Sequence, residues 1–156
     1  MKLKSLLALS ALLIGIISCN QKSEFEAYHT LDTSGWHKDS LVVFPVPLSD
    51  TLTSHNVYLN IRNAGNYEFS NIWLFMQIKA PDGNILTDTL ELQLADPTGK
   101  WTGSGIGDLF DNQFIYKKNV FFPASGTYEF SVQQGMRATM LKGIQDVGLR
   151  IEKRDE

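Results

Sequence analysis

Glycines stand at every second position in the middle of the segment Trp101–Gln113, at positions 103, 105 and 107. Glycine-rich loops can cradle a phosphate, but this spacing differs from G-x-G-x-x-G. The residues that follow favour a strand rather than the helix whose N-terminus would hold an anion. The segment also lacks the G-x-S-x-G pattern of a catalytic serine. The pattern therefore favours a structural loop over nucleotide binding.

Three oxygen-bearing side chains, Asp108, Asp111 and Asn112, lie near the end of this segment. Carboxylate and amide oxygens are the ligands that Ca²⁺ takes in proteins, so a calcium site is one interpretation. The same side chains also hydrogen-bond to nearby backbone in tight turns. We prefer the second interpretation, and we expect a structural loop that holds no metal or other cofactor.

The histidines, His29, His37 and His55, lack the short spacing that is typical of zinc ligands. A Ser/His/Asp triad and the paired carboxylates of glycosidases assemble from distant positions, but no residue here is marked as a nucleophile. We therefore assign no catalytic residue and expect that the protein is not an enzyme.

The tryptophans, Trp36, Trp73 and Trp101, are candidates for stacking on sugars, which makes a lipid-anchored carbohydrate-binding module the alternative function. Trp73 and Phe75 are more informative, because both take the outward parity of a strand whose inward residues are already apolar. Either this strand is covered on both faces, or the two aromatics form a partner surface.

The elements that position these side chains are strands, because apolar and polar residues alternate along most of the chain after residue 40. Turn sequences such as Pro81-Asp82-Gly83-Asn84 separate the alternating runs. Short strands at this spacing predict an all-β fold, an antiparallel β-sandwich of the jelly-roll or immunoglobulin-like kind. The expected strands are 41–44, 57–61, 72–78, 86–94, 114–122, 128–132 and 147–151.

A few residues depart from the alternation. Pro45 and Pro47 suit an edge strand, since proline cannot donate to the hydrogen-bond ladder. Asp88 takes the inward parity of its strand, and we expect it at the rim of the sheet rather than at a bulge. The only helical candidate is Met136–Gln145, with one or two turns.

The N-terminus reads as a signal peptide. Lys2 and Lys4 precede an apolar run, Leu6–Ile17, that is too short as a helix for a bilayer core of about 30 Å. The run ends in Ile16-Ile17-Ser18-Cys19, which resembles the lipobox of bacterial lipoproteins. We expect residues 1–18 to be removed and Cys19 to be lipidated, and the acyl chains, palmitate among them, to anchor the protein in the membrane.

After the lipidated cysteine, we expect residues 19–30 to form a polar tether and residues 31–156 to form a single β-sandwich domain. Asn20 is not the aspartate that retains some lipoproteins in the inner membrane, so we expect an outer-membrane location. Gln21–Glu26 loosely resembles the acidic tag of surface-displayed lipoproteins, and cell-surface display is the alternative to a periplasm-facing domain.

Composition limits the function classes. The 156 residues are 43% hydrophobic and 20% charged, which is typical of a globular protein. The net charge of −3 argues against nucleic-acid binding, which needs a basic surface. The single cysteine, Cys19, excludes an internal disulfide and a cysteine-rich metal site.

The lipobox and the β-rich body together resemble the GldH family of gliding-motility lipoproteins, most specifically from Trp101 onward. The resemblance implies a cell-envelope lipoprotein that the gliding machinery needs and that is linked to the type IX secretion system. Its implied partners are other gliding or secretion envelope proteins, and it brings no catalytic residues. The similar segments are Trp101–Asp108, Asp111–Gln113, Tyr116–Pro123, Gly126–Tyr128, Met136–Arg137 and Gly143–Lys153.

Overall fold

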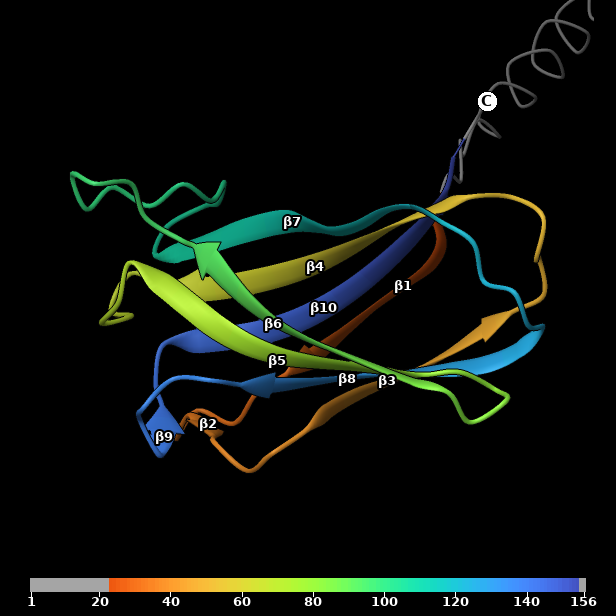
Figure 1. Ribbon diagram of the computed structural model, residues 1–156. Helices are drawn as coiled ribbons and strands as arrows, with labels where there is room; N and C mark the ends of the chain where they lie inside the picture. Colours follow the sequence, from red (N-terminus) through yellow and green to blue (C-terminus); the bar gives the residue numbers. More distant parts are fainter. Residues whose placement is uncertain (1–22, 155–156) are drawn as a thin grey trace, which may run out of the picture.

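The computed structural model describes residues 23–154, and all of the regular structure in this range is β-strand (Figure 1). The predicted all-β fold is confirmed. In chain order the strands are β1 (Ser23–Thr30), β2 (Trp36–His37), β3 (Val42–Leu48), β4 (His55–Ala64), β5 (Asn71–Lys79), β6 (Ile85–Gln93), β7 (Leu109–Val120), β8 (Gly126–Gln134), β9 (Met140–Leu141) and β10 (Ile144–Lys153).

The strands form two four-stranded antiparallel sheets and a two-stranded ribbon. One sheet has the order β1-β10-β4-β7, the other has the order β3-β8-β5-β6, and β2 pairs with β9. After β3 the chain crosses between the large sheets five times, the last time by way of β9, and only β5 and β6 form a hairpin within one of them. This arrangement confirms the predicted antiparallel sandwich.

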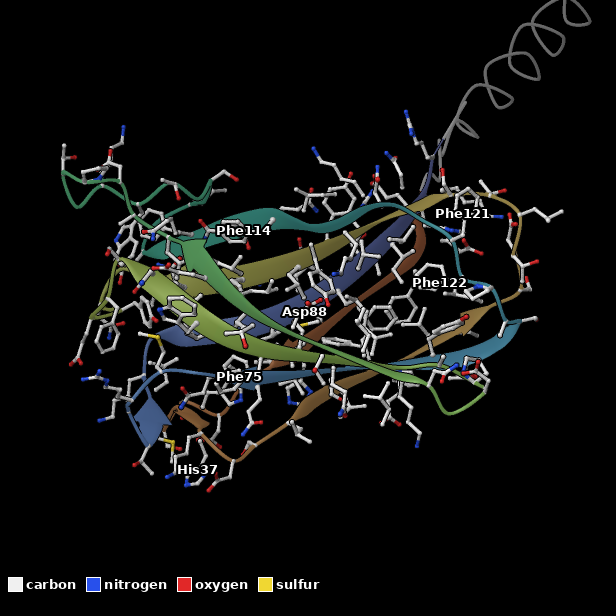
Figure 2. All side chains as sticks on the ribbon, in the orientation of Figure 1. His37, Phe75, Asp88, Phe114, Phe121 and Phe122 are labelled. Carbon is white, nitrogen blue, oxygen red and sulfur yellow. The ribbon has the colours of Figure 1, made fainter. Side chains whose placement is uncertain are left out.

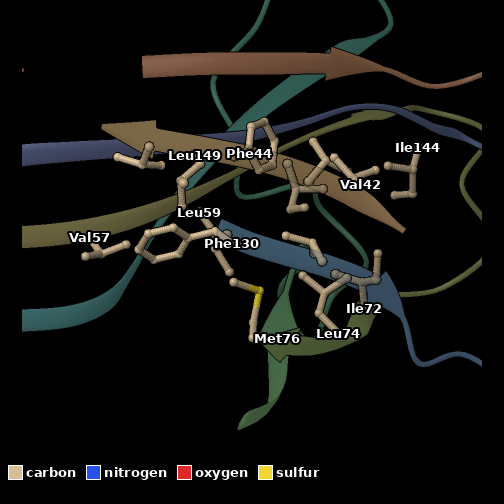
Figure 3. Close-up of a cluster of buried hydrophobic side chains, with 14 of the residues drawn as sticks. Val42, Phe44, Val57, Leu59, Ile72, Leu74, Met76, Phe130, Ile144 and Leu149 are labelled. Carbon is tan, nitrogen blue, oxygen red and sulfur yellow. The ribbon is translucent and has the colours of Figure 1, made fainter. Parts of the chain in front are cut away.

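The core lies between the two large sheets and is built by the inward parity of each strand. β4 and β10 supply one side and β3, β5 and β8 the other (Figure 3). Full burial of each such side chain contributes about 1.5–3 kcal/mol. Representative core residues are Val42, Phe44, Val57, Leu59, Ile61, Ile72, Leu74, Met76, Phe130, Val132, Val147, Leu149 and Ile151.

The prolines and Asp88 lie where the sequence predicted. Pro45 and Pro47 belong to β3, which is an edge strand. Asp88 lies on the opposite edge strand, β6, and its register with β5 is continuous, without a bulge. The Asp88 carboxylate points toward β7, where Tyr116 Oη donates to it at 2.6 Å and Lys117 Nζ lies 2.7 Å away (Figure 2).

The helix predicted for Met136–Gln145 is wrong, because β9 and the start of β10 occupy this segment. A buried amide, that of Gln134, binds two backbone groups of this segment. Its Oε1 accepts from the Met136 N–H at 2.8 Å, and its Nε2 donates to the Ala138 carbonyl at 2.8 Å. Gly143 then takes a φ of +84°, a left-handed conformation that ends a helix.

The predicted tether is wrong for Ser23–Thr30, which forms β1 and pairs with β10. Phe25 and Ala27 pack against the core, so this strand belongs to the sandwich rather than to a polar linker. The predicted signal peptide, residues 1–18, and the predicted lipidation site, Cys19, lie outside the described residues.

Candidate interaction surface and loop sites

The outer face of the β3-β8-β5-β6 sheet carries two exposed aromatics, Trp73 and Phe75 on β5. Trp73 is 39% exposed and Phe75 is 48% exposed. The residues between and beside them, Ile72, Leu74 and Met76, are buried in the core. β5 is therefore apolar on both faces, and its outer face is open to solvent.

A hollow beside Phe75 widens this surface. It has a volume of about 420 Å³ and is lined by Leu41, Phe75, Gln77, Thr89 and Gln133, among others. Phe75 lies between Thr89 of β6 and Gln133 of β8 in the sheet register. Gln133 Nε2 donates to the Lys38 carbonyl at 2.6 Å, which ties the chain just before Leu41 to β8.

Gly135 allows the Phe75 ring and the Cβ of Trp73 to lie against the backbone. A Cβ at this position would lie 3.2 Å from the Phe75 ring and 3.3 Å from Trp73 Cβ. Trp73 itself lines a second hollow with Phe69, Met136 and Arg137. Sequence reasoning missed Leu41 and Phe69 as parts of this surface. Leu41 belongs to the expected strand 41–44, but that run is apolar throughout and shows no alternation, and β3 begins one residue later. Phe69 precedes β5 and has no parity to show which face it takes.

The glycine-rich loop, residues 101–108, turns tightly just before β7. Ser104 and Asp111 exchange two backbone hydrogen bonds of 2.9 and 2.6 Å. A Cβ on Gly105 would collide with the Leu109 carbonyl oxygen, and Gly107 has a φ of +72°. Two of the three glycines are therefore required by the backbone geometry of the turn.

The structure does not bring Asp108, Asp111 and Asn112 together as a ligand set. Asp111 Oδ1 accepts from Arg62 Nε at 2.6 Å on the outer face of the sheet. Asn112 is buried on the inner face, where its Nδ2 donates to Asn63 Oδ1 at 2.9 Å. Asp108 lies against Gly65. Within residues 23–154, no group of three His, Cys, Asp or Glu side chains is placed to hold a metal ion.

The histidines lie apart from one another. His29 is exposed and His37 is half-buried, whereas His55 is fully buried at the start of β4. His55 Nε2 lies 2.6 Å from Glu24 Oε2, and its ring packs edge-on against Phe122. Nδ1 of His55 has no hydrogen-bond partner. The arrangement is a buried structural pair rather than a triad, because among residues 23–154 neither ring nitrogen has a hydroxyl or thiol as its hydrogen-bond partner.

The tryptophans do not share an exposed face. Trp36 is buried and donates from Nε1 to the Ser40 carbonyl at 3.0 Å. Trp101 packs between Tyr67 and Phe110. Of the three, only Trp73 is an exposed side chain, whereas Trp101 is half-buried, so these positions do not form the aligned platform of a carbohydrate-binding module.

Among residues 23–154, no helix has the length and apolar character that a membrane span needs.

The fold and the surface define a β-sandwich domain with an exposed aromatic strand and no assembled catalytic or metal centre among its described residues. The chain belongs to the GldH lipoprotein family, whose pattern matches residues 23–151. It is 41% identical over 145 residues to the gliding motility lipoprotein GldH homolog of Christiangramia forsetii, covering 88% of each chain. It is 37% identical over 161 residues to the gliding motility lipoprotein GldH of Flavobacterium johnsoniae, covering 99% of this chain and 98% of that one. The predicted resemblance is confirmed.

Solved structures resemble the chain only distantly. The Yersinia pseudotuberculosis-derived mitogen is 8% identical with a TM-score of 0.39, over 85% of this chain and 88% of that chain. The tobacco streak virus coat protein is 13% identical with a TM-score of 0.29, over 85% and 89%. At these values neither likeness carries weight for fold or function.

Proposed function

We propose that this chain is a non-enzymatic lipoprotein that supports the gliding motility and type IX secretion machinery through protein–protein contacts. Cys19 carries the lipid, and the anchor lies in the outer membrane with the β-sandwich facing the periplasm. Family membership supports the lipoprotein and gliding parts of this proposal, since both relatives are named gliding motility lipoproteins. Display of the domain on the cell surface is the alternative orientation.

The observation that carries the protein-contact role is the exposure of Trp73 and Phe75 together on one strand. Aromatic side chains are enriched in interface cores and dominate their energetics. The two rings leave roughly 150–200 Å² exposed, given 150–250 Å² for a whole aromatic side chain. Covering that area contributes about 4 kcal/mol at 25 cal/mol per Å². A partner protein is the natural cover for such a surface.

Crosslinking in intact cell envelopes tests the contact role. The double variant Trp73→Ala/Phe75→Ala should lose the wild-type crosslinked neighbours. Ile115→Ala is the matched control, because Ile115 is a similarly exposed apolar residue on the outer face of the other sheet. Unchanged crosslinks in the double variant, or equal losses in the control, would contradict the proposed surface.

The lipid anchor is tested separately with Cys19→Ala. The variant should leave the membrane fraction or accumulate as precursor, because the proposed anchor consists of acyl chains on Cys19 that insert into the bilayer. Detergent-phase partitioning measures this directly, and partitioning equal to wild type would rule out the anchor.

A further inference from the structure

The β1-β10-β4-β7 sheet has one end at which a terminus of each of its four strands lies. Ser23 of β1 pairs with Glu152 of β10, Lys153 of β10 pairs with His55 of β4, and His55 pairs with Val120 of β7. β1 and β4 begin at this end, whereas β10 and β7 finish there. The start of β1, the start of β4 and the end of β7 therefore lie at the same end of the sandwich, at the right of Figure 1.

This end carries strongly exposed apolar side chains. Leu52, in the loop between β3 and β4, is 87% exposed, and Phe121, just after β7, is 58% exposed. Figure 2 shows Phe121 near this end of the molecule. Phe121 also lines a mostly apolar groove of about 370 Å³ with Ile85 and Leu86 of β6, which are exposed as well.

Hydrogen bonds hold the two segments in place. The Arg154 N–H donates to the Ser54 carbonyl at 2.9 Å, which fixes the loop that carries Leu52. Arg154 Nη1 donates to Asn119 Oδ1 at 2.7 Å, two residues before Phe121. The buried His55 ring packs edge-on against Phe122, the residue after Phe121. The apolar side chains are thus presented by a fixed end of the sandwich.

The covalent chain brings this end to the membrane. Because Ser23 already lies in β1, only residues 20–22 separate Cys19 from the sandwich. A chain of that length extends at most about 14 Å. A lipid on Cys19 therefore holds the end with Leu52 and Phe121 close to the bilayer surface, whereas the glycine-rich loop lies at the far end of β7.

From this geometry we infer that the end of the sandwich formed by Leu52, Phe121, Ile85 and Leu86 docks on the bilayer that holds the anchor, with Leu52 and Phe121 entering the lipid interface. Exposed apolar side chains beside a lipid anchor add burial to its hold on the membrane. Docking also fixes the orientation of the domain, because it leaves the sheet face with Trp73 and Phe75 along the side of the sandwich, free for a partner. The inference rests on the proposed lipid anchor at Cys19.

Site-specific fluorescence in vesicles tests the docking. Cys19 is the single cysteine of the chain, so a cysteine introduced into the lipidated protein is its only free thiol. Leu52→Cys and Phe121→Cys are labelled with the polarity-sensitive dye NBD and reconstituted in phosphatidylcholine vesicles that contain no other protein. Ile106→Cys is the matched control, because Ile106 is 95% exposed in the loop at the opposite end.

The dyes at positions 52 and 121 should shift to shorter wavelength and be quenched by spin-labelled lipid, whereas the dye at position 106 should keep its emission in water. Flotation of the vesicles is measured on the same samples. If the protein floats but positions 52 and 121 behave like 106, docking is wrong and the anchor stands. If the protein does not float, the anchor itself is wrong, and the docking inference fails with it.

Discussion

His55 Nε2 and Glu24 Oε2 lie 2.6 Å apart, and this contact joins β4 to β1 across the strand between them, β10. The imidazole is fully buried and its other nitrogen has no partner, so Glu24 satisfies the only hydrogen bond of the ring. The pair therefore fastens the first strand of the sandwich at the end from which the chain leads to Cys19.

Removal of the Glu24 carboxylate should destabilise the fold. Glu24→Ala leaves the buried His55 ring without any partner, and an unsatisfied buried polar group costs about 1–3 kcal/mol. Glu26→Ala is the control on the same strand, because Glu26 pairs with Arg150 at the surface and such pairs contribute about 1 kcal/mol or less. Urea unfolding measures both, and an equal loss in the two variants would show that burial of the pair is unimportant.

This pair also shows why β1 could not be predicted from the sequence. The alternation in strands such as β5 is local and visible, whereas the partners of Glu24 and Glu26 lie 31 and 124 residues away. Without those partners the segment reads as a polar tether. The same limit applies to the tryptophans, because only the packing of Trp36 and Trp101 against distant residues separates them from the exposed Trp73.

Acid should weaken the contact between β6 and β7. Hydrogen bonds from Lys117 and Tyr116 lower the pKa of the Asp88 carboxyl below its ordinary value of about 3.9. A lowered folded-state pKa means that the charged carboxylate stabilises the fold above about pH 4, and that this contribution is lost as the pH falls further.

The variant Asp88→Asn isolates that contribution. It should unfold about 1 kcal/mol more easily than wild type at pH 7, since Asp88 is partly exposed and its ion pair is screened. The difference should shrink as the pH is lowered below 4, and unfolding curves at several pH values measure it. A difference that is constant with pH would assign the effect to shape rather than to charge.

The glycine-rich loop should not tolerate a side chain at its tightest point. Gly105→Ala places a Cβ against the Leu109 carbonyl oxygen, which the backbone can relieve only by moving, and we expect a loss of about 1–3 kcal/mol. Ser104→Ala is the neighbouring control, because Ser104 is exposed and already has a Cβ, so this substitution adds no atom to the loop. Thermal melts compare the two, and a fully stable Gly105→Ala would mean that the turn adapts freely.

Chelation should leave the protein unchanged. Asp111 Oδ1 is already paired with Arg62. Asn112 is buried, and its Oδ1 accepts from Thr102 Oγ1 at 3.4 Å, so these oxygens do not converge on one cation position. The melting temperature should therefore be the same with added Ca²⁺ and with EDTA. A fall of several degrees in EDTA would overturn the structural interpretation of this loop in favour of a metal site.

Loss of the exposed aromatics should cost little folding stability. Trp73 and Phe75 are both more than a third exposed, and the double variant Trp73→Ala/Phe75→Ala leaves the core side chains of β5 untouched. We expect it to lower the free energy of unfolding by less than about 2 kcal/mol, because both positions are open to solvent and truncation there leaves no closed cavity. Leu74→Ala, between the two and fully buried, should cost about 2–5 kcal/mol through the cavity it leaves.

Urea titrations of wild type and the two variants show whether the outer face of β5 serves a partner or is needed for folding. If the double variant is as unstable as Leu74→Ala, the aromatics are part of the core of the sheet, and lost crosslinks in that variant would report unfolding rather than a missing contact.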